Sequence, residues 1–350
     1  MIKGISAIIA TIMLLMITVS LVGVFYVFSS TLAGTTTSSG GQQASQLASQ
    51  LSMCMQIDNI LGNQITLRNC GKGIIENKAL VVTMDDIELD ASTQTILEGN
   101  SSIVNVSGLW QIPFGKRNLK ISNGAAVALA LVGVQPKKDG LVGSWNFDEG
   151  NGTTAYDGSG NGNVGTLNNF DWNATSGWTS GKFGKGLQFD GTNDYVDAGN
   201  AASLKNAIGN NSFAVSAWFV SAGTQGTTNG AEIVEKYNPG FLLRVHALGT
   251  AIIASNGTTA PVSTSIYSNT WYHVVLVRNR ENNIVSLYLN GVLRSQGGDW
   301  ANDFTSNQPL YIGYSCCGGD NIKFNGTIDE VRIWNKALAP DDTVTMKQII

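Results

Sequence analysis

The chain begins with a long apolar stretch and continues as a polar, glycine-rich sequence of short alternating segments. Residues 5–28 include no charged side chain over 24 positions. As an α-helix this stretch would be ~36 Å long at ~1.5 Å per residue, enough to cross a hydrocarbon core of ~30 Å. A secretory signal has a shorter apolar region of about 7–15 residues. The pattern therefore predicts a transmembrane helix, with residues 1–33 as the hydrophobic N-terminal unit.

Short alternating segments follow a linker. Residues 34–53 are rich in Gly, Thr and Ser and end in a weak helical pattern, which predicts a flexible joint with a short helix. In residues 54–134, apolar and polar positions alternate on both sides of Gly62 and Asn63, as in a β-hairpin. The apolar run at residues 125–134 has the length of a buried strand. About seven short strands predict a small Ig-like β-sandwich.

The pattern changes again after residues 135–140, where proline, charge and glycine mark a domain boundary. Residues 141–341 contain longer strands with regular alternation, and one of them places Val285 and Leu287 on the same face. A second domain is therefore expected there, and residues 342–350 are left as a C-terminal tail. The predicted fold class is mostly β, with one N-terminal helix and two β-domains.

Composition narrows the class of protein. Charged residues make up 13% of the chain and the formal net charge is −4. The lysines and arginines are scattered, so nothing indicates nucleic-acid binding. Low charge with abundant Gly, Ser, Thr and Asn is typical of an extracellular β-protein. Seven Asn-x-Ser/Thr sequons fit an exported, glycosylated protein; they are Asn100, Asn105, Asn151, Asn173, Asn210, Asn256 and Asn325.

The four cysteines and two histidines do not have the spacing of a zinc site. Cys54 and Cys70 flank the first predicted hairpin, which would bring them together, and a disulfide between them is expected outside the membrane. Cys316 and Cys317 are adjacent; they could form a strained vicinal disulfide or stay as two thiols.

The first ten residues of the apolar region carry a family resemblance. The segment KGISAIIATI, residues 3–12, resembles the N-terminus of archaeal type IV pilins and archaellins, although Ala7 stands where the family usually has proline. The resemblance implies processing between Gly4 and Ile5 by a prepilin peptidase. It also implies that the helix holds the subunit in the membrane before assembly and packs against other pilin copies afterwards.

A second resemblance covers residues 141–341. This part looks like a laminin-G-like, concanavalin A-like jelly roll of two packed antiparallel sheets. The resemblance rests on an ordered series of segments, which are LVGSWNFDEG (141–150), DGSGNGN (157–163), GKFGKGLQFDG (181–191), FAVSAWF (213–219), WYHVVLV (271–277) and FNGTIDEVRIW (324–334). Tryptophans at positions 145, 218, 271 and 334 fall in the expected strands and are predicted to be core residues.

Catalytic chemistry is not expected. Glycoside hydrolases need two carboxyl groups that face each other across a cleft. Glu232 and Glu235 are three positions apart, and Asp329 and Glu330 are adjacent, so a regular strand would point each pair to opposite faces. His273 lies within an aromatic strand, where a structural role is expected. The chain is therefore predicted not to be an enzyme.

A structural calcium ion is the one cofactor that the sequence suggests. In jelly rolls similar to this one, calcium often lies where the first and last strands meet. The matching positions here are Asp157, Gly160, Asn163 and Asp329. Oxygen-rich turns can bind Ca²⁺, but the same residues are also common in ordinary turns. Asp329 could instead face water or accept backbone amides of the Asp157 loop without a metal.

These features together favour a pilin-like adhesin at the cell surface, which displays a laminin-G-like domain for a glycan or protein ligand. Its partners would be the membrane, other pilin subunits and that ligand, with no nucleic acid. One alternative is a surface or scaffold protein with a single membrane anchor that does not polymerise. The other is a membrane-tethered carbohydrate-active enzyme, which the missing carboxylate pair disfavours.

Overall fold

The computed structural model describes residues 53–348, apart from 77–78, 174, 210, 226–229, 237–239, 257–261, 301–305 and 316–321. The predicted processing site at Gly4 and Ile5, the thiol pair Cys316 and Cys317, and the sequon at Asn210 lie outside the described residues. Among the helices that are described, none is long and apolar enough to cross a membrane. The anchor in the first 33 residues therefore stays a prediction.

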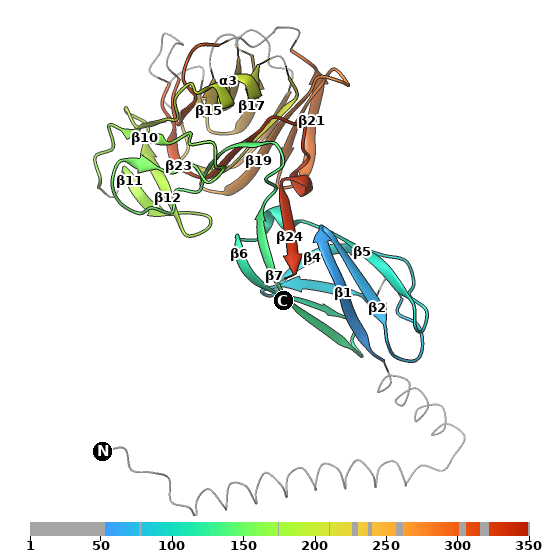
Figure 1. The fold of residues 1–350 in the computed structure, drawn as a ribbon. Coiled ribbons are helices and arrows are strands. Elements are labelled where there is room, and N and C mark those ends of the chain that lie inside the picture. Colours follow the sequence, from blue (N-terminus) through green and yellow to red (C-terminus); the bar gives the residue numbers. More distant parts are fainter. Residues whose placement is uncertain are drawn as a thin grey trace, which may run out of the picture.

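Two β-domains make up the described chain (Figure 1). The first is a closed barrel with the strand order β1-β2-β5-β4-β3-β6-β7-β24. Its strands are β1 (Met55–Gly62), β2 (Gln64–Asn69), β3 (Val81–Met84), β4 (Ile87–Ser92), β5 (Ser101–Ser107), β6 (Gly115–Ser122), β7 (Val127–Pro136) and β24 (Val344–Gln348).

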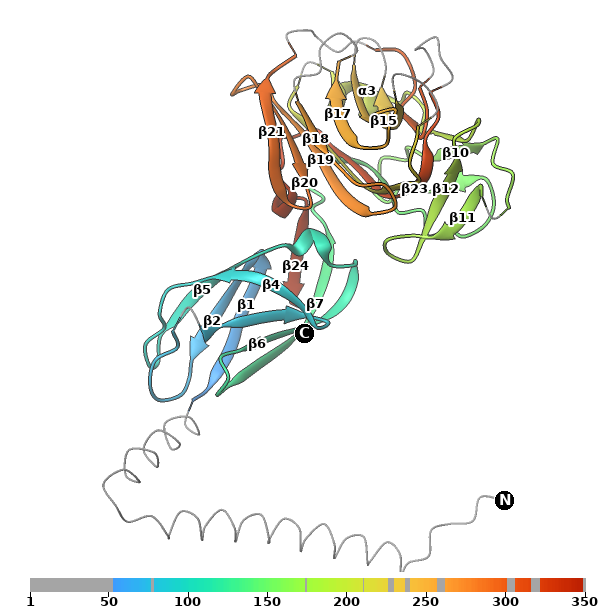
Figure 2. The ribbon, with the colours of Figure 1, turned by 180° about the vertical axis from the view of Figure 1, so that it is seen from behind.

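The barrel differs from the predicted open sandwich because its last strand comes from the end of the chain. β24 pairs with β7 on one side and with β1 on the other, which closes the ring. Figure 2 shows β24 reaching down from the second domain into the first. Residues 342–350, expected as a tail, thus supply a barrel strand, and the second domain is inserted between two strands of the first. Closure removes the exposed edges that an open sheet would have.

The first hairpin forms as predicted. β1 and β2 pair through Gly62, whose φ of +66° is a conformation that favours glycine. The Cys54–Cys70 disulfide is confirmed, with Cα atoms 4.9 Å apart, and the Cys70 amide donates to the Cys54 carbonyl.

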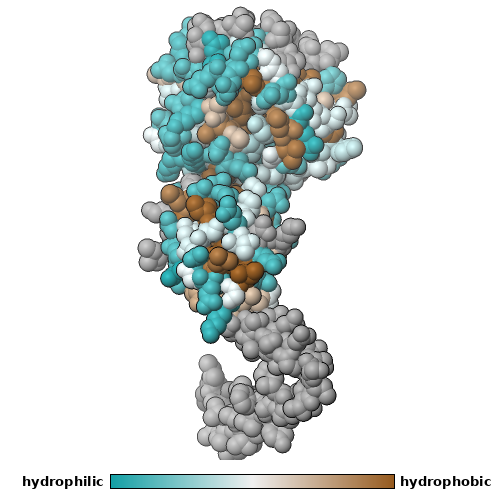
Figure 3. Space-filling view, turned by 90° about the vertical axis from the view of Figure 1, so that its right-hand side faces the viewer, coloured by the Kyte–Doolittle hydropathy of each residue, from teal (hydrophilic) through white to brown (hydrophobic). Residues whose placement is uncertain are grey.

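The apolar run at residues 125–134 differs from the buried strand expected, because β7 lies on the barrel surface. One side of β7 faces the core, whereas Leu129 on the other side is 71% exposed. Figure 3 shows apolar side chains on the surface of the barrel, in small groups between hydrophilic ones. The length of the run thus predicted a strand correctly, but its apolar residues do not all reach the core.

The second domain is the predicted jelly roll of two antiparallel sheets. The first sheet has the order β18-β17-β16-β15-β22-β13-β10-β9. Its strands are β9 (Thr154–Ala155), β10 (Gly165–Asn168), β13 (Tyr195–Asp197), β15 (Ala231–Lys236), β16 (Phe241–Val245), β17 (Ala251–Ser255), β18 (Val262–Ser265) and β22 (Tyr311–Ile312). A short helix, α3 (Ala202–Ile208), precedes β14.

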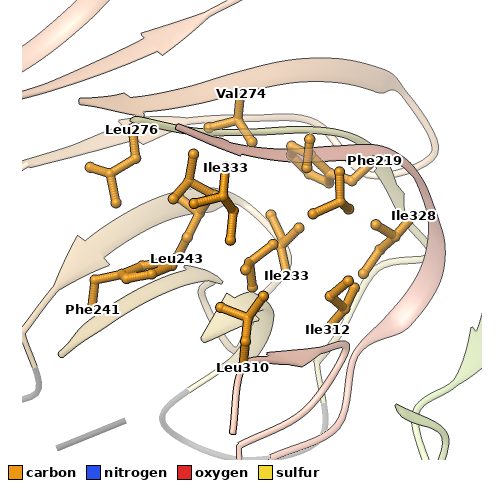
Figure 4. Packing of buried hydrophobic residues seen from close by; sticks show 14 of the residues in the cluster. Phe219, Ile233, Phe241, Leu243, Val274, Leu276, Leu310, Ile312, Ile328 and Ile333 are labelled. Carbon is orange, nitrogen blue, oxygen red and sulfur yellow. The ribbon is translucent and has the colours of Figure 1, made fainter. Parts of the chain in front are cut away.

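The second sheet has the order β11-β12-β23-β14-β19-β20-β21, and β8 also pairs with β23. Its strands are β8 (Leu141–Trp145), β11 (Gly177–Ser180), β12 (Lys185–Asp190), β14 (Phe213–Ser221), β19 (Trp271–Asn279), β20 (Ile284–Leu289), β21 (Val292–Gly298) and β23 (Asn325–Trp334). Buried side chains from both sheets meet between the layers; Figure 4 shows Phe241 and Leu243 of the first sheet near Leu276 and Ile333 of the second.

The four predicted core tryptophans have different surroundings. Trp145 packs in the core between the sheets. Trp334 belongs to a separate cluster with Leu141 and Leu338, and its indole donates to the carbonyl of Lys137 in the connection between the domains. Trp218 is buried against the barrel, and Trp271 is partly exposed. Strand periodicity predicted that these residues would lie in a sheet, but not which of its faces would be covered.

The barrel packs on the outer face of the second sheet. Trp110, in the short 3₁₀ helix η2 (Leu109–Gln111), contacts Trp218. The ring of Phe114 lies 4.2 Å from the guanidinium of Arg332, and the Gly108 amide donates to Asp341 over 2.8 Å. These contacts cover part of the second sheet, so less of its outer face is open to a ligand.

Candidate functional face of the first sheet

A β-bulge in β15 brings two glutamates to the same face. Glu232 is paired with Arg244 and Val234 with Leu243, so Ile233 is an extra residue on β15. Ile233 and Val234 both pack in the core. Glu232 and Glu235 therefore both lie on the outer face of the first sheet. The prediction that this pair points to opposite faces was wrong, because the extra residue shifts the alternation.

Glu232 lies in a buried ion pair. Its side chain is fully buried and forms an ion pair with Arg244 over 2.9 Å. Burial raises the pKa of Glu232 to about 7, and the positive charge of Arg244 opposes this shift. Burial and the ion pair thus act on the protonation of Glu232 in opposite directions, and burial has the larger effect.

Three tyrosines lie beside the acidic pair. Tyr311 is paired with Glu235 across the strands and with Asp197 on the other side. Its ring centroid is 5.8 Å from that of Tyr195 and 5.4 Å from that of Tyr314, and the latter two are 4.9 Å apart. All three rings are partly exposed. We call Glu232, Glu235, Arg244, Tyr195, Tyr311 and Tyr314 the tyrosine–glutamate face.

A lysine completes this arrangement. The ammonium of Lys323 lies 3.3 Å from the centroid of the Tyr314 ring, a cation–π contact. Burial lowers the pKa of Lys323 and raises that of Tyr314. For Tyr311, burial is again the largest cause, assisted by Asp197, and it raises the pKa to about 12. Tyr311 and Tyr314 therefore stay neutral hydrogen-bonding groups at physiological pH.

Aromatic rings beside carboxylates and a guanidinium suit a neutral ligand that has both apolar and hydroxyl surfaces. The tyrosine rings offer apolar area, and the partly exposed guanidinium of Arg244 offers directional hydrogen bonds, whereas Glu232 and Glu235 are fully buried. Nothing in the local sequence pattern singled out Tyr195 or Tyr311 as functional residues. An alternating pattern alone would not have found the glutamates, because the bulge breaks it.

Asp157, predicted as a calcium ligand, organises its own loop. Its carboxylate accepts hydrogen bonds from the amides of Ser144, Ser159 and Asn163, at 2.8 to 3.0 Å, and from the Ser159 hydroxyl. Asn163 is buried and donates to the Val142 carbonyl over 2.6 Å. Backbone and hydroxyl donors thus already surround both oxygens of Asp157. Gly160 in this loop has a φ of +91°.

Asp329 belongs to a different network. One oxygen accepts from the amide of Phe183 over 3.0 Å, and the other is buried without a hydrogen-bond partner. Burial raises the pKa of Asp329 to about 8. The contacts described do not join Asp329 to Asp157, and no three His, Cys, Asp or Glu side chains are grouped to hold a metal within the described residues. Calcium binding stays a prediction, which melting in calcium against EDTA would test.

The described sequons fall into two groups. Asn100, Asn105, Asn151 and Asn173 are exposed, whereas Asn256 and Asn325 are partly buried. Exposure is the first requirement for attachment of a glycan, so the structure favours the first group.

Known proteins share the second domain. Residues 190–343 match the family model described as the Concanavalin A-like lectin/glucanases superfamily, so this part of the chain is a concanavalin A-like domain, as the resemblance predicted. The comparison with curated proteins found no match.

Several solved structures are similar to this chain. Domain 4 of AbnA, a GH43 extracellular arabinanase from Geobacillus stearothermophilus, solved with arabinotriose, is 22% identical; the alignment covers 59% of this chain and 98% of that one, with a TM-score of 0.44. The binding domain of Paraclostridial Mosquitocidal Protein 1 is 15% identical, covering 59% and 51%, with a TM-score of 0.45. A mutant Trypanosoma rangeli sialidase is 15% identical, covering 65% and 41%, with a TM-score of 0.45. The alignments therefore cover about half or less of the length of the mosquitocidal-protein chain and of the sialidase chain.

Proposed function

We propose that this chain is a pilin-like surface protein whose concanavalin A-like domain binds a glycan through the tyrosine–glutamate face. The observation that carries the proposal is the meeting of three partly exposed tyrosines with Glu232, Glu235 and Arg244 on one sheet. Binding there is non-covalent. The rings take the apolar side of a sugar, and the partly exposed Arg244 bonds its hydroxyls, held in place by the buried Glu232.

The packing of the domains supports this choice of face. The outer side of the second sheet is covered in part by Trp110 and Phe114 of the barrel. The connection after β23 covers more of it, since Leu338 packs with Trp334 and Leu141. The contacts named above between the barrel and the jelly roll all involve the second sheet or the connection after it.

Display on a filament would follow from the N-terminal segment. In the proposed function, residues 5–28 anchor the subunit and then pack with other subunits. Many copies of a weak site on one filament give avidity that exceeds the affinity of a single site. The alternative is a single membrane anchor that does not polymerise. The two differ in whether the chain is cleaved between Gly4 and Ile5. Mass spectrometry of the native protein distinguishes them: a mature chain that begins at Ile5 supports the pilin, and an intact Met1 supports the anchor.

The glycan proposal is tested on the detergent-solubilised full chain with an immobilised oligosaccharide array. We expect Tyr311→Ala to lose binding to the best ligand by ten-fold or more, since the substitution removes a ring at the centre of the face. Tyr267→Ala is the matched control, because Tyr267 is 80% exposed and lies outside the face. Equal binding by wild type and Tyr311→Ala would show that another surface is used.

A second candidate function, glycoside hydrolysis, is favoured by one observation. The bulge places Glu232 and Glu235 on one face, and burial raises the pKa of Glu232 to about 7, as a general acid requires. Release of reducing sugar from the bound oligosaccharide, abolished by Glu232→Gln, would establish the activity. Binding without release, unchanged by extended incubation, would leave recognition as the function.

A further inference from the structure

The loop between β10 and β11 holds a tryptophan in a fixed and exposed position. Trp172 is 45% exposed, and its φ of +55° is rare for a bulky residue. The ring stacks on Phe170, with centroids 5.6 Å apart, and Phe170 is anchored in the core beside Phe189. A Cβ on Gly177 would come within 3.0 Å of the indole. Because Gly177 has no side chain, the Trp172 ring can lie against the backbone there. Almost half of Trp172 remains open to solvent.

The next residue is the asparagine of a sequon, in a closed turn. Oδ1 of Asn173 accepts hydrogen bonds from the amide and the hydroxyl of Thr175, both at 2.8 Å, and from the amide of Ser176 at 3.1 Å. The Asn173 amide donates to the Ser176 carbonyl over 2.9 Å. The hydrogen bonds described for the Asn173 side chain all use Oδ1. Its Nδ2 atom is therefore available to form a covalent bond.

A buried hydrogen bond fixes this turn. The hydroxyl of Ser176 donates to Asp194 over 2.8 Å and accepts from the Asp171 amide over 3.0 Å. Both Ser176 and Asp194 are almost fully buried. These two bonds tie Asp171 and Ser176, on either side of Trp172 and Asn173, to the buried Asp194.

Other sequons are placed differently. Asn325 is partly buried at the start of β23, and the hydroxyl of Thr327 donates to Gln188 instead of to its own asparagine. Asn105 lies within β5, with its Oδ1 accepting from Gln64. Asn100 and Asn151 are exposed but follow glycines. Among the sequons whose asparagine the structure describes, Asn173 combines an exposed asparagine and a hydrogen-bonded turn with a preceding exposed indole.

We propose that Asn173 carries an N-linked glycan and that the first sugar packs on the indole of Trp172. In this modification Nδ2 bonds to the anomeric carbon of a sugar from a lipid-phosphate-linked donor. The bond from that carbon to the phosphate oxygen breaks, the lipid phosphate leaves, and Nδ2 loses one proton. The inference rests on export of the chain, which belongs to the proposed function.

Peptide mass spectrometry of the full chain, made in a host with an N-glycosylating membrane, tests the attachment. Trypsin should release residues 139–182 as one peptide, which contains the sequons of both Asn151 and Asn173. We expect a glycan mass on this peptide that Thr175→Ala removes and Thr153→Ala, the matched control, retains. An unmodified peptide, or a mass lost with Thr153→Ala instead, would overturn the proposal.

A double-mutant cycle tests the stacking. Thr175→Ala should lower the melting temperature more in the wild-type background than when Trp172→Ala is already present, because the loss of the Thr175–Asn173 hydrogen bond is common to both and the sugar–indole contact is lost only in the first. An equal loss in both backgrounds would show that the sugar does not use the indole. The N-terminus of the same sample distinguishes a failure of this proposal from a failure of the proposed function. A chain that begins at Ile5 and has no glycan on Asn173 refutes the Asn173 site alone. A chain that is not processed refutes the pilin-like function.

Discussion

The indole of Trp110 is stacked on the imidazole of His273, with ring centroids 5.2 Å apart and 7° between the planes. Trp110 belongs to the barrel and His273 to the jelly roll. His273 also contacts Trp218, at 5.2 Å between centroids, so it lies among the rings of both domains. Burial, with a smaller effect of Arg332, lowers the pKa of His273 to about 3 and keeps it neutral. These are packing contacts, and the structural role expected for His273 stays a prediction. The two domains are thus joined by packing as well as by β24.

Trp110→Ala should uncouple the domains. Loss of this partly buried ring is expected to cost about 2 kcal/mol of unfolding free energy, below the ~3–5 kcal/mol typical of a fully buried tryptophan. Urea unfolding of the full chain should change from one transition toward two. Tyr267→Ala, at a site that is 80% exposed, should change stability by no more than about 0.5 kcal/mol. A single unshifted transition in Trp110→Ala would mean that the stack contributes nothing to the coupling.

Met346→Ala should destabilise the barrel more than the jelly roll. Met346 lies in β24 and is 1% exposed within the barrel core. Truncation of a buried methionine costs about 2–5 kcal/mol. Hydrogen exchange should accelerate first in β1 and β7, the two strands that β24 joins. Leu129→Ala on the exposed side of β7 is the control. Uniform exchange in both domains would contradict a barrel that depends on the C-terminal strand.

Asp329→Asn should change how stability depends on pH. Burial raises the pKa of Asp329 from 3.8 to about 8, although the Phe183 amide lowers it; Asp148 raises it further and Arg332 lowers it. The folded protein therefore keeps a proton that the unfolded chain releases near 3.8. This contribution to stability is full below pH 3.8 and is lost as the pH rises through about 8.

The amide introduced by Asp329→Asn cannot ionise, so the variant should be more stable than wild type at pH 9, with the difference shrinking toward pH 6. Thermal melting at both pH values measures it. Glu98→Gln is a matched control, because Glu98 is exposed. If both variants follow the wild-type curve, Asp329 does not titrate in this range.

Reduction of the Cys54–Cys70 disulfide should lower the stability of the barrel. The bond closes a sequence separation of 16 residues, for which the chain-entropy model gives about 3 kcal/mol. Denaturation with and without a reducing agent measures the loss. The Cys54→Ser/Cys70→Ser variant should match the reduced protein and no longer respond to reductant. Continued sensitivity of this variant would show that other thiols contribute.

Much of this protein was determined by local sequence. Alternation around Gly62 predicted the first hairpin and placed Cys54 near Cys70. Alternation from Leu141 to Trp334 predicted strands, and the resemblance of these ordered segments to a laminin-G-like jelly roll implied two antiparallel sheets. These features depend on neighbouring residues: a period of two selects a strand, and glycine selects a tight turn. The sequence could therefore give the strands and the fold class before any long-range contact was known.

Only the tertiary structure decided on which sheet face the acidic side chains lie and how the barrel closes. The bulge at Ile233 puts Glu232 and Glu235 on one face. A second bulge, where Glu330 has a φ of +55°, puts Asp329 and Glu330 outside the core together. A bulge is fixed by the register with the partner strand, which local alternation does not contain. Local sequence did not predict the closure of the barrel by β24 either. The strands that pair with β24 lie more than 200 residues away, so the pairing depends on where the folded jelly roll places the C-terminal segment.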